Sequence, residues 1–174
     1  MSLPIIQEPA AILRGIAKPV PVVDATSLWV KKLTAEMSDA LAACVDGVAL
    51  AAPQINQPWR VFVVGERALL KRGDTKPWPG DLVFINPKII RQSRRQAEFL
   101  EGCLSVRNKY GTIKRHERVS VEAYDLAGLK FVRHASGLLA QVFQHEIEHL
   151  DGTLFIDRAW DIHEVEPDQN QGHA

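Results

Sequence analysis

Residues 144–152, QHEIEHLDG, contain two histidines four positions apart, with a glutamate directly after the first. On a helix, positions four apart share one face, so His145 and His149 can direct their imidazoles to one point. Two imidazoles on one face suit a divalent transition metal. Glu146 lies beside the first histidine, where a carboxylate can act as general base toward water activated by a metal. The pattern therefore predicts a metal-dependent hydrolase, and the alternative is a chance match on a polar helix.

A third ligand must come from elsewhere in the chain, because catalytic sites usually have three protein ligands and one open position. A histidine six residues after His149 would complete the metzincin pattern, but Phe155 occupies that position and cannot bind a metal. A downstream glutamate, as in thermolysin-like peptidases, would have to be Glu164 or Glu166. The chain around them has few apolar residues to hold a ligand in place, which disfavours this alternative.

Cys103, within residues 101–105 (EGCLS), is the third candidate. One thiolate with two imidazoles is a ligand set that suits zinc and iron. A lone cysteine is usually a small buried hydrophobe. Glu101 and Ser105 on either side argue against an apolar burial site for Cys103, whereas Cys44 lies in an apolar helical stretch and is interpreted as core.

The composition is that of an ordinary globular protein, with 174 residues, 46% hydrophobic and 24% charged. Lys+Arg and Asp+Glu number 21 each, so no net basic field favours nucleic acid or an anionic membrane as main partner. A cluster at Arg91, Arg94 and Arg95 is interpreted as a solvated strand end. We expect no transmembrane helix and no secretory signal. With only two cysteines, the expected location is the reducing cytoplasm.

Apolar periodicity outlines the secondary structure. It predicts an amphipathic helix from residues 24–27, which offer N-cap side chains, to Gly47. Strands are expected at 60–65, at 81–90 with an interruption at Asn86-Pro87, near 97–101, at 118–124 and at 129–133. Residues 66–81 are expected to form a loop. A final helix, beginning at Ala135 or Ser136 and ended by Gly152, carries both histidines.

This order predicts an α+β fold in which mostly antiparallel sheets pack around a central metal-bearing helix. We expect a single catalytic domain over residues 1–160. Residues 161–174 are expected to form a short, acidic, flexible tail.

Residues 47–54, GVALAAPQ, combine small side chains with a glycine at one end and a proline near the other. Such a segment lets another backbone approach closely. Taken alone, the pattern favours a tightly packed turn.

Three segments occur in this order: GVALAAPQ, EGCLS and QHEIEHLDG. Together they resemble the three motifs of the peptide deformylase family, roughly G-x-G-L-A-A-x-Q, E-G-C-L-S and H-E-x-x-H. Weaker similarity extends to about Asp157. The resemblance implies a metal-dependent hydrolase that removes the N-terminal formyl group from formyl-methionine of newly made polypeptides and releases formate. The nascent formylated polypeptide would be its partner, with transient proximity to the ribosome and no direct binding of nucleic acid or membrane.

The resemblance also implies roles at the reacting centre. Cys103, His145 and His149 would bind the metal, Fe(II) in the family, with Zn, Ni or Co as possible substitutes. Glu146 would serve as general base and acid. The side-chain amide of Gln54 and the backbone N–H of Leu104 would stabilise the oxyanion.

Other matched positions would bind substrate or support the site. Gly47, Val48 and Ala49 would line the peptide-binding edge and pair with the substrate backbone like an added strand. Candidate walls of the methionine pocket are Val48, Phe99, Val142 and Phe143, although Phe143 fits a core position equally well. An ion pair between Glu101 and Arg115 is expected to support the site.

The chain departs from the family pattern at several points. Val106 is followed by Arg107 where the family commonly has a proline, and a common Arg or Tyr position near the pocket mouth falls on Lys109 or Tyr110. Ala49 stands where the family has its second glycine, so a methyl group would lie beside the groove. Many members carry a long basic C-terminal helix that contacts the ribosome, in place of the short acidic tail expected here. A protein that binds N-terminal peptides without turnover is the alternative function, and the intact Glu146 and Gln54 argue against it.

Overall fold

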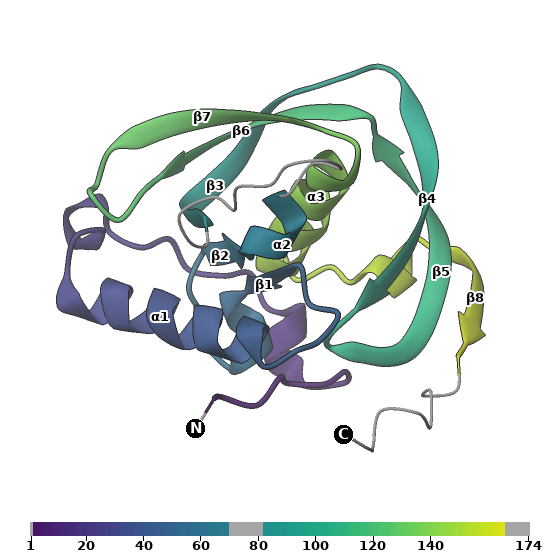
Figure 1. The fold of residues 1–174 in the computed structure, drawn as a ribbon, viewed down its shortest axis with the longest axis horizontal. Helices are drawn as coiled ribbons and strands as arrows, with labels where there is room; N and C mark the ends of the chain where they lie inside the picture. The colour runs from purple at the N-terminus through teal and green to yellow at the C-terminus, as the bar shows by residue number, and fades with distance from the viewer. Residues whose placement is uncertain (1, 70–81, 166–174) are drawn as a thin grey trace.

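The computed structural model describes residues 2–69 and 82–165. Within these ranges, strands form two antiparallel sheets around one helix (Figure 1). The larger sheet has the order β1 (Ala49–Ala51), β2 (Val61–Val64), β3 (Leu82–Gln92), β6 (Arg118–Tyr124) and β7 (Lys130–Ser136). The smaller sheet has the order β4 (Gln96–Cys103), β5 (Val106–His116) and β8 (Trp160–Glu164). The expected α+β class with antiparallel sheets is confirmed.

The helices that accompany these sheets are α1 (Leu28–Ala42), α2 (Glu66–Leu69) and α3 (Leu138–Leu150). Short 3-10 turns form η1 (Ala11–Arg14), η2 (Val22–Asp24), η3 (Ala52–Ile55) and η4 (Phe155–Asp157). None of the helices in the described part of the chain is both long and apolar enough to cross a membrane.

The central helix α3 carries both histidines of the motif. It begins later than the sequence indicated, because β7 continues to Ser136, which pairs with Arg118. Gly137 then takes a φ of 59°, a value that a side chain would disfavour, and turns the chain into the helix. The buried Phe143 of α3 contacts Phe84 of β3, with ring centroids 4.9 Å apart. Aromatic packing therefore fixes α3 against the larger sheet.

A polar clamp fixes α3 to the smaller sheet. The Gln144 side chain accepts a hydrogen bond from the His116 backbone N–H and donates one to the His116 carbonyl, both 2.9 Å long. Gln144 is buried and also donates to the Ala140 carbonyl, at 2.8 Å. The helix is thus held from both sides, directly beside His145.

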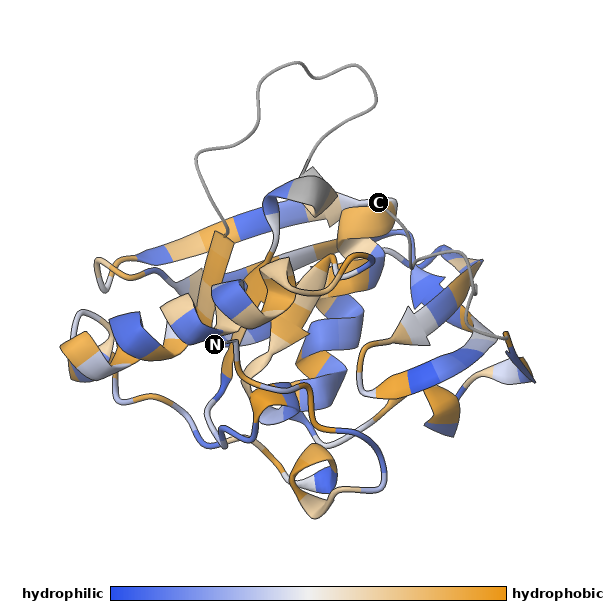
Figure 2. Ribbon diagram, turned by 60° about the horizontal axis from the view of Figure 1, so that its bottom comes forward, coloured by the Kyte–Doolittle hydropathy of each residue, from blue (hydrophilic) through white to orange (hydrophobic). Residues whose placement is uncertain are grey.

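Helix α1 matches the expected amphipathic helix. The Ser27 hydroxyl caps it by accepting a hydrogen bond from the Val30 N–H. Figure 2 shows hydrophobic and hydrophilic residues alternating along α1. The apolar face packs with β1 and β2 in one hydrophobic cluster that includes Leu33, Met37 and Leu41.

The interruption expected at Asn86-Pro87 is a register shift between β3 and β6. Asn86 has a φ of 53°, and its side chain accepts a hydrogen bond from the Val20 N–H and donates one to the Val20 carbonyl, at 2.8 and 2.7 Å. The kink in β3 therefore binds the N-terminal segment.

Four elements differ from the sequence expectations. Ala49–Ala51, where the pattern taken alone favoured a tightly packed turn, form strand β1. The eleven-residue strand β5 was not anticipated. Helix α2 lies at the start of the expected loop, and residues 70–81 of that loop lie outside the described residues. The first residues of the expected flexible tail belong to β8, which pairs with β5 at Lys109, Tyr110 and Thr112. The rest of that tail, 166–174, also lies outside the described residues.

Candidate metal centre

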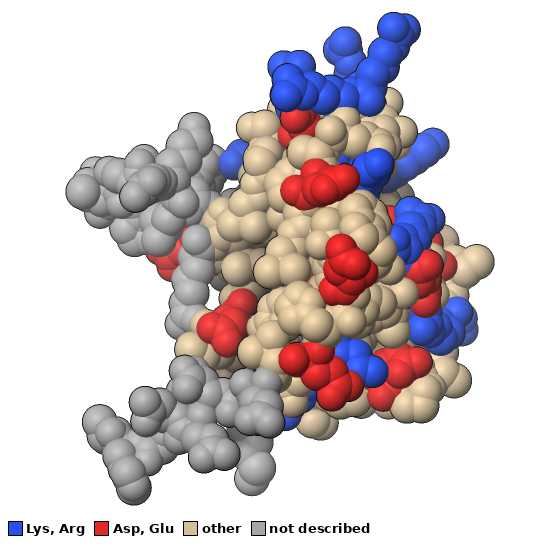
Figure 3. All heavy atoms as spheres, turned by 90° about the vertical axis from the view of Figure 1, so that its right-hand side faces the viewer, with Lys and Arg blue, Asp and Glu red and all other residues tan. Residues whose placement is uncertain are grey.

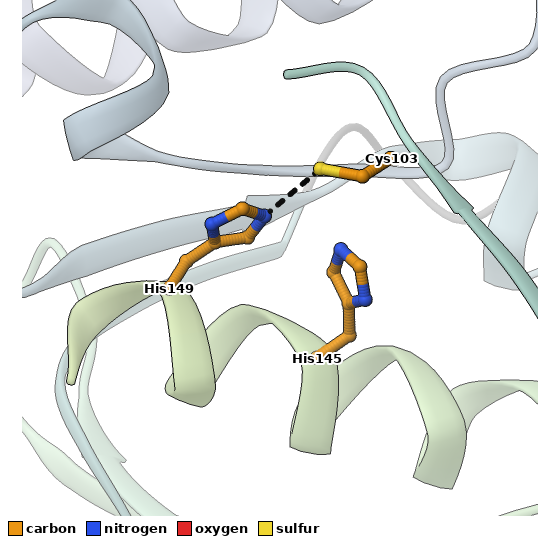
Figure 4. A group of neighbouring side chains, drawn as sticks. All are labelled: Cys103, His145 and His149. Atoms are coloured by element: carbon orange, nitrogen blue, oxygen red, sulfur yellow. Dashed lines mark hydrogen bonds between the residues drawn. The ribbon is translucent and has the colours of Figure 1, made fainter. Parts of the chain in front are cut away.

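Cys103, at the end of β4, meets the side chains of His145 and His149 from α3 (Figure 4). Their ligand atoms all lie within 4.8 Å of one another, and Cys103 Sγ is 3.2 Å from His149 Nε2. A tetrahedral ion with bonds of 2.0 to 2.3 Å needs its donors about 3.3 to 3.8 Å apart. One thiolate and two imidazoles at this spacing fit a divalent transition metal.

The turn between β4 and β5 positions Cys103. The register of the two strands shifts between Gly102 and Cys103, which brings the cysteine opposite Val106. A side chain at Gly102 would meet the Tyr110 ring, since an added Cβ would lie 2.7 Å from Tyr110 Cε1. The Ser105 N–H donates to Cys103 Sγ at 3.4 Å. The short side chains of this motif therefore let the strand turn the sulfur toward α3.

The Cys103 thiol lies among groups that favour its ionised form. Burial by itself raises the pKa of Cys103, but the neighbouring imidazoles of His149 and His145 outweigh burial and hold it well below its usual value. A thiolate is the form that binds a metal.

A buried ion pair orients His145. Its Nδ1 lies 3.0 Å from Glu101 Oε2, and Arg115 donates two hydrogen bonds of 2.8 Å to the same carboxylate. The Glu101–Arg115 pair implied by the family resemblance is thus confirmed. Burial opposes ionisation of Glu101, yet the hydrogen bonds from Arg115 and His145 lower its pKa to about 2. A carboxylate on Nδ1 fixes the ring and leaves Nε2 for a metal.

Glu146 is buried beside these ligands, and its Oε2 has no hydrogen-bond partner among the described residues. Burial raises the pKa of Glu146 to about 7, although His145 and His149 oppose the shift. A carboxyl group with a pKa near neutrality can both accept and release a proton. Its position in the wall of a cavity makes this proton available to a bound molecule.

Gln54 enters the site from η3, where it is almost fully buried. Its Oε1 accepts from the Ala51 N–H at 2.9 Å, which directs the amide nitrogen toward the metal ligands. Gln54 Nε2 donates to Ser105 Oγ at 3.1 Å and lies 3.6 Å from Cys103 Sγ. The amide is therefore held as a donor at the site.

A cavity of about 390 Å³ opens onto His145 and Glu146. Of the residues assigned by sequence to this site, those in its lining are Gly47, Val48, Ala49, Gln54, Cys103, Leu104, Val142, His145 and Glu146. His149 is buried behind it and reaches the same centre through Nε2.

Two expectations for this cavity do not match the structure. Phe99 is absent from the lining, and its neighbour Leu100 is present instead, because successive residues of a strand point to opposite faces. Cys44, expected in the core, is half-buried and lies in the lining. Phe143, which the sequence left open between the methionine pocket and the core, belongs to the core.

Sequence reasoning missed further lining residues, including Ile5, Leu100, Leu138 and Gln141. Gln144 was likewise not singled out, although it ties α3 to β5. Its polar side chain next to the metal motif was the only available signal, and a solvent-exposed glutamine would look the same.

Comparison with known proteins places this geometry in context. A family model described as polypeptide deformylase matches residues 2–165. A peptide deformylase of Rhizobium meliloti (strain 1021) is 38% identical over 154 residues, which cover 88% of this chain and 83% of the relative. One from Thermomicrobium roseum (strain ATCC 27502 / DSM 5159 / P-2) is 43% identical over 159 residues, covering 90% and 85%.

Solved structures agree. The Met-Ala-Ser-bound class I type b peptide deformylase from Acinetobacter baumannii has a TM-score of 0.80 and 31% identity, covering 91% of this chain and 98% of that chain. The peptide deformylase from Thermotoga maritima has a TM-score of 0.79 and 32% identity, covering 92% and 99%.

Proposed function

This chain belongs to the peptide deformylase family, whose activity is the metal-dependent removal of the N-terminal formyl group from nascent polypeptides, and we propose how its own residues perform that reaction. The observation that carries the proposal is the juxtaposition of three ligand atoms within 4.8 Å of one another and a buried glutamate whose pKa is about 7. Both border the cavity that would receive the substrate.

Cys103, His145 and His149 would hold the metal, and Glu101 would keep His145 in its ligating orientation. When bound, the metal activates water and polarises the formyl carbonyl. Fe(II) is our assignment, with Zn, Ni and Co as substitutes, because a mixed thiolate and imidazole set accepts several of these ions.

Glu146 would take a proton from the water that attacks the formyl carbon. As the carbonyl oxygen gains negative charge, Gln54 Nε2 and the Leu104 N–H would donate hydrogen bonds to it. Glu146 would then pass the proton to the peptide nitrogen as the C–N bond breaks. Formate and a free N-terminal amine are the products. The pKa of about 7 suits both proton transfers.

The cavity edge would select the substrate. Gly47, Val48 and Ala49 would pair with the backbone of the formylated peptide like a further strand beside β1. Val48 and Val142 would contact the methionine side chain, since both lie in the lining. The Ala49 methyl would narrow this edge.

The cellular setting follows from the substrate. Nascent polypeptides emerge from ribosomes, so transient proximity to the ribosome fits the activity, with the cytoplasm as location. A reducing compartment would also protect the Cys103 thiolate from oxidation.

The proposal is tested by formate release from formyl-Met-Ala-Ser, with acetyl-Met-Ala-Ser as the control that tests selectivity for the formyl group. The protein is prepared without oxygen and loaded with Fe(II). We expect release from the formyl peptide only. Glu146→Gln should keep its metal and lose at least about a hundredfold in kcat, because the base is gone.

A wild-type protein that binds the formyl peptide without releasing formate would contradict the catalytic proposal and support a binding protein instead. Full activity in the Glu146→Gln variant would overturn only the assignment of Glu146 as the base and would leave the deformylase activity standing.

A further inference from the structure

A second concavity lies at the end of the larger sheet where β3, β6 and β7 run side by side. It encloses about 670 Å³, and its lining contains Arg91, Arg94 and Arg118 but no carboxylate. Figure 3 shows Lys and Arg side chains gathered at the top of the molecule, where in Figure 1 β3 runs into β4. Ser120 and His134 also line this concavity, which we call the basic groove.

The strand register places these side chains on one face of the sheet. Arg91 lies opposite Ser120, and Ser120 lies opposite His134. Arg118, two residues before Ser120, points to the same side. The alternate residue Val119 points into the hydrophobic core. The basic groove is therefore the outer face of the sheet.

The arginines of the basic groove make no ion pair with a carboxylate in the described chain. Five arginines elsewhere do have such partners: Arg14, Arg60, Arg95, Arg115 and Arg158 each lie within 4.0 Å of an acidic side chain. The equal totals of 21 basic and 21 acidic residues conceal this local excess of positive charge.

The guanidinium groups of the basic groove, which lack carboxylate partners, favour binding of an anion. Arg91 and Arg118 are diagonal neighbours on adjacent strands, where like charges repel. A guanidinium group donates two parallel hydrogen bonds to a phosphate. The Ser120 hydroxyl lies 2.8 Å from His134 Nδ1, so a hydroxyl and an imidazole stand beside the arginines as further polar groups. Phosphate contacts in nucleic-acid complexes use these side-chain types.

The layout favours a chain of phosphates over a single one. The three arginines are exposed and are spread from β6 across β3 into the turn that follows it. Exposed, separated guanidinium groups hold one small anion weakly, whereas successive phosphates of a polymer add their contacts. We propose that the basic groove binds the phosphate backbone of a nucleic-acid strand, independently of base sequence. This proposal departs from the sequence-based expectations of a solvated strand end and of no direct nucleic-acid binding.

The groove is separate from the catalytic cavity, because no residue lines both. Removing its charges should therefore leave formate release unchanged. Binding to the groove and deformylation can fail independently of each other.

The test uses the full-length, metal-loaded protein and a fluorescein-labelled oligouridylate about 15 nucleotides long. Fluorescence anisotropy gives Kd over a range of salt concentrations. The variant is Arg91→Gln with Arg118→Gln. The matched control is Lys31→Gln with Lys32→Gln, which removes the same charge from the exposed surface of α1.

We expect Kd of the groove variant to rise at least about tenfold at low salt. The slope of log Kd against log salt should fall by about 1.4, since two phosphate contacts are lost. The control should match the wild type in Kd, and both variants should match it in formate release. Neither variant should differ from the wild type in the midpoint temperature of thermal unfolding.

Three results would overturn the proposal. The first is a wild type that shows no salt-dependent binding of the oligonucleotide. The second is a lysine control that weakens binding as much as the groove variant does. The third is complete displacement of the oligonucleotide by millimolar inorganic phosphate at constant ionic strength, which would make the groove a site for one small anion.

Discussion

Residues adjacent in the sequence have different environments in this centre. The His145 ring is fixed by Glu101. The next residue, Glu146, is buried with an unpartnered carboxylate oxygen. One group is therefore held in a fixed orientation, and the other has a pKa of about 7, raised by burial. One turn of α3 therefore presents an oriented imidazole beside a buried carboxyl group, as the proposed ligand and base require.

The two cysteines allow a matched test of the third ligand. Cys103→Ser should reduce metal affinity by more than about a hundredfold, the upper end of what losing a supporting partner costs. Cys44→Ser should retain the metal, because Cys44 donates to the Ala40 carbonyl and a hydroxyl can replace that bond. Elemental analysis after dialysis against a weak chelator measures both. Equal metal content in the two variants would remove Cys103 from the ligand set.

The grouping of the three candidate ligands could be predicted from sequence because their chemistry is local and specific. Two histidines at helical spacing and a cysteine in a polar context leave few alternatives. The residues that line the cavity could not be predicted in the same way, because the choice between Phe99 and Leu100 depends on which face of β4 is turned toward the cavity. Period-two alternation gives two faces but does not say which one meets the ligand.

At the scale of elements, the site depends on α3 being held between two sheets. Phe143 packs on the larger sheet and Gln144 bonds to the smaller one. The sequence predicted α3, α1 and most strands of the larger sheet, whose apolar patterns are strong. It did not predict β5, because the buried Arg115 falls where an apolar residue would be expected. A charge with a partner fourteen residues earlier in the chain, Glu101, has no local signature.

The Gln144 clamp predicts a stability effect. Gln144→Ala leaves the backbone N–H and carbonyl of His116 without their partners, so the free energy of unfolding should fall by about 1 to 3 kcal/mol. Gln141→Ala is the control on the same helix, where one bond of 3.3 Å to the Leu100 carbonyl is lost and the fall should be below about 1 kcal/mol. Urea unfolding followed by circular dichroism measures both. If Gln141→Ala were as destabilising as Gln144→Ala, the two hydrogen bonds between Gln144 and His116 would not contribute more to stability than the single bond of Gln141.

At the scale of the whole molecule, three segments distant in sequence form one centre, and the N-terminal segment closes around them. Gln7 Nε2 donates to the Leu104 carbonyl at 2.9 Å, beside the candidate ligand Cys103. Arg14 reaches Asp157 at 2.6 Å, and Asp157 also accepts from the Leu154 N–H at 2.8 Å. The first turn η1 is thus fastened to η4, the turn that follows the metal-bearing helix. The weakly patterned, proline-containing start of the chain gave no sequence indication of these contacts.

This closure predicts a pH dependence of stability. Burial raises the pKa of Asp157, but the hydrogen bonds from Leu154 and Arg14 outweigh it and lower the pKa below the usual 3.8. A depressed carboxyl pKa stabilises the fold above the unfolded value, and that contribution disappears as pH falls through the folded pKa. Because the pair is partly exposed, it should contribute less than about 1 kcal/mol.

The comparison is between wild type and Asp157→Asn in urea unfolding at pH 6 and at pH 3. We expect Asp157→Asn to be less stable than wild type at pH 6 and the gap to shrink at pH 3, because pH 3 lies below the usual pKa of 3.8, where the unfolded chain takes up the proton more readily than the folded one. Asp39→Asn, on the exposed surface of α1, should differ from wild type by less than about 0.5 kcal/mol at pH 6. A gap for Asp157→Asn that stays constant or widens toward pH 3 would mean that the carboxylate charge does not hold η1 to η4.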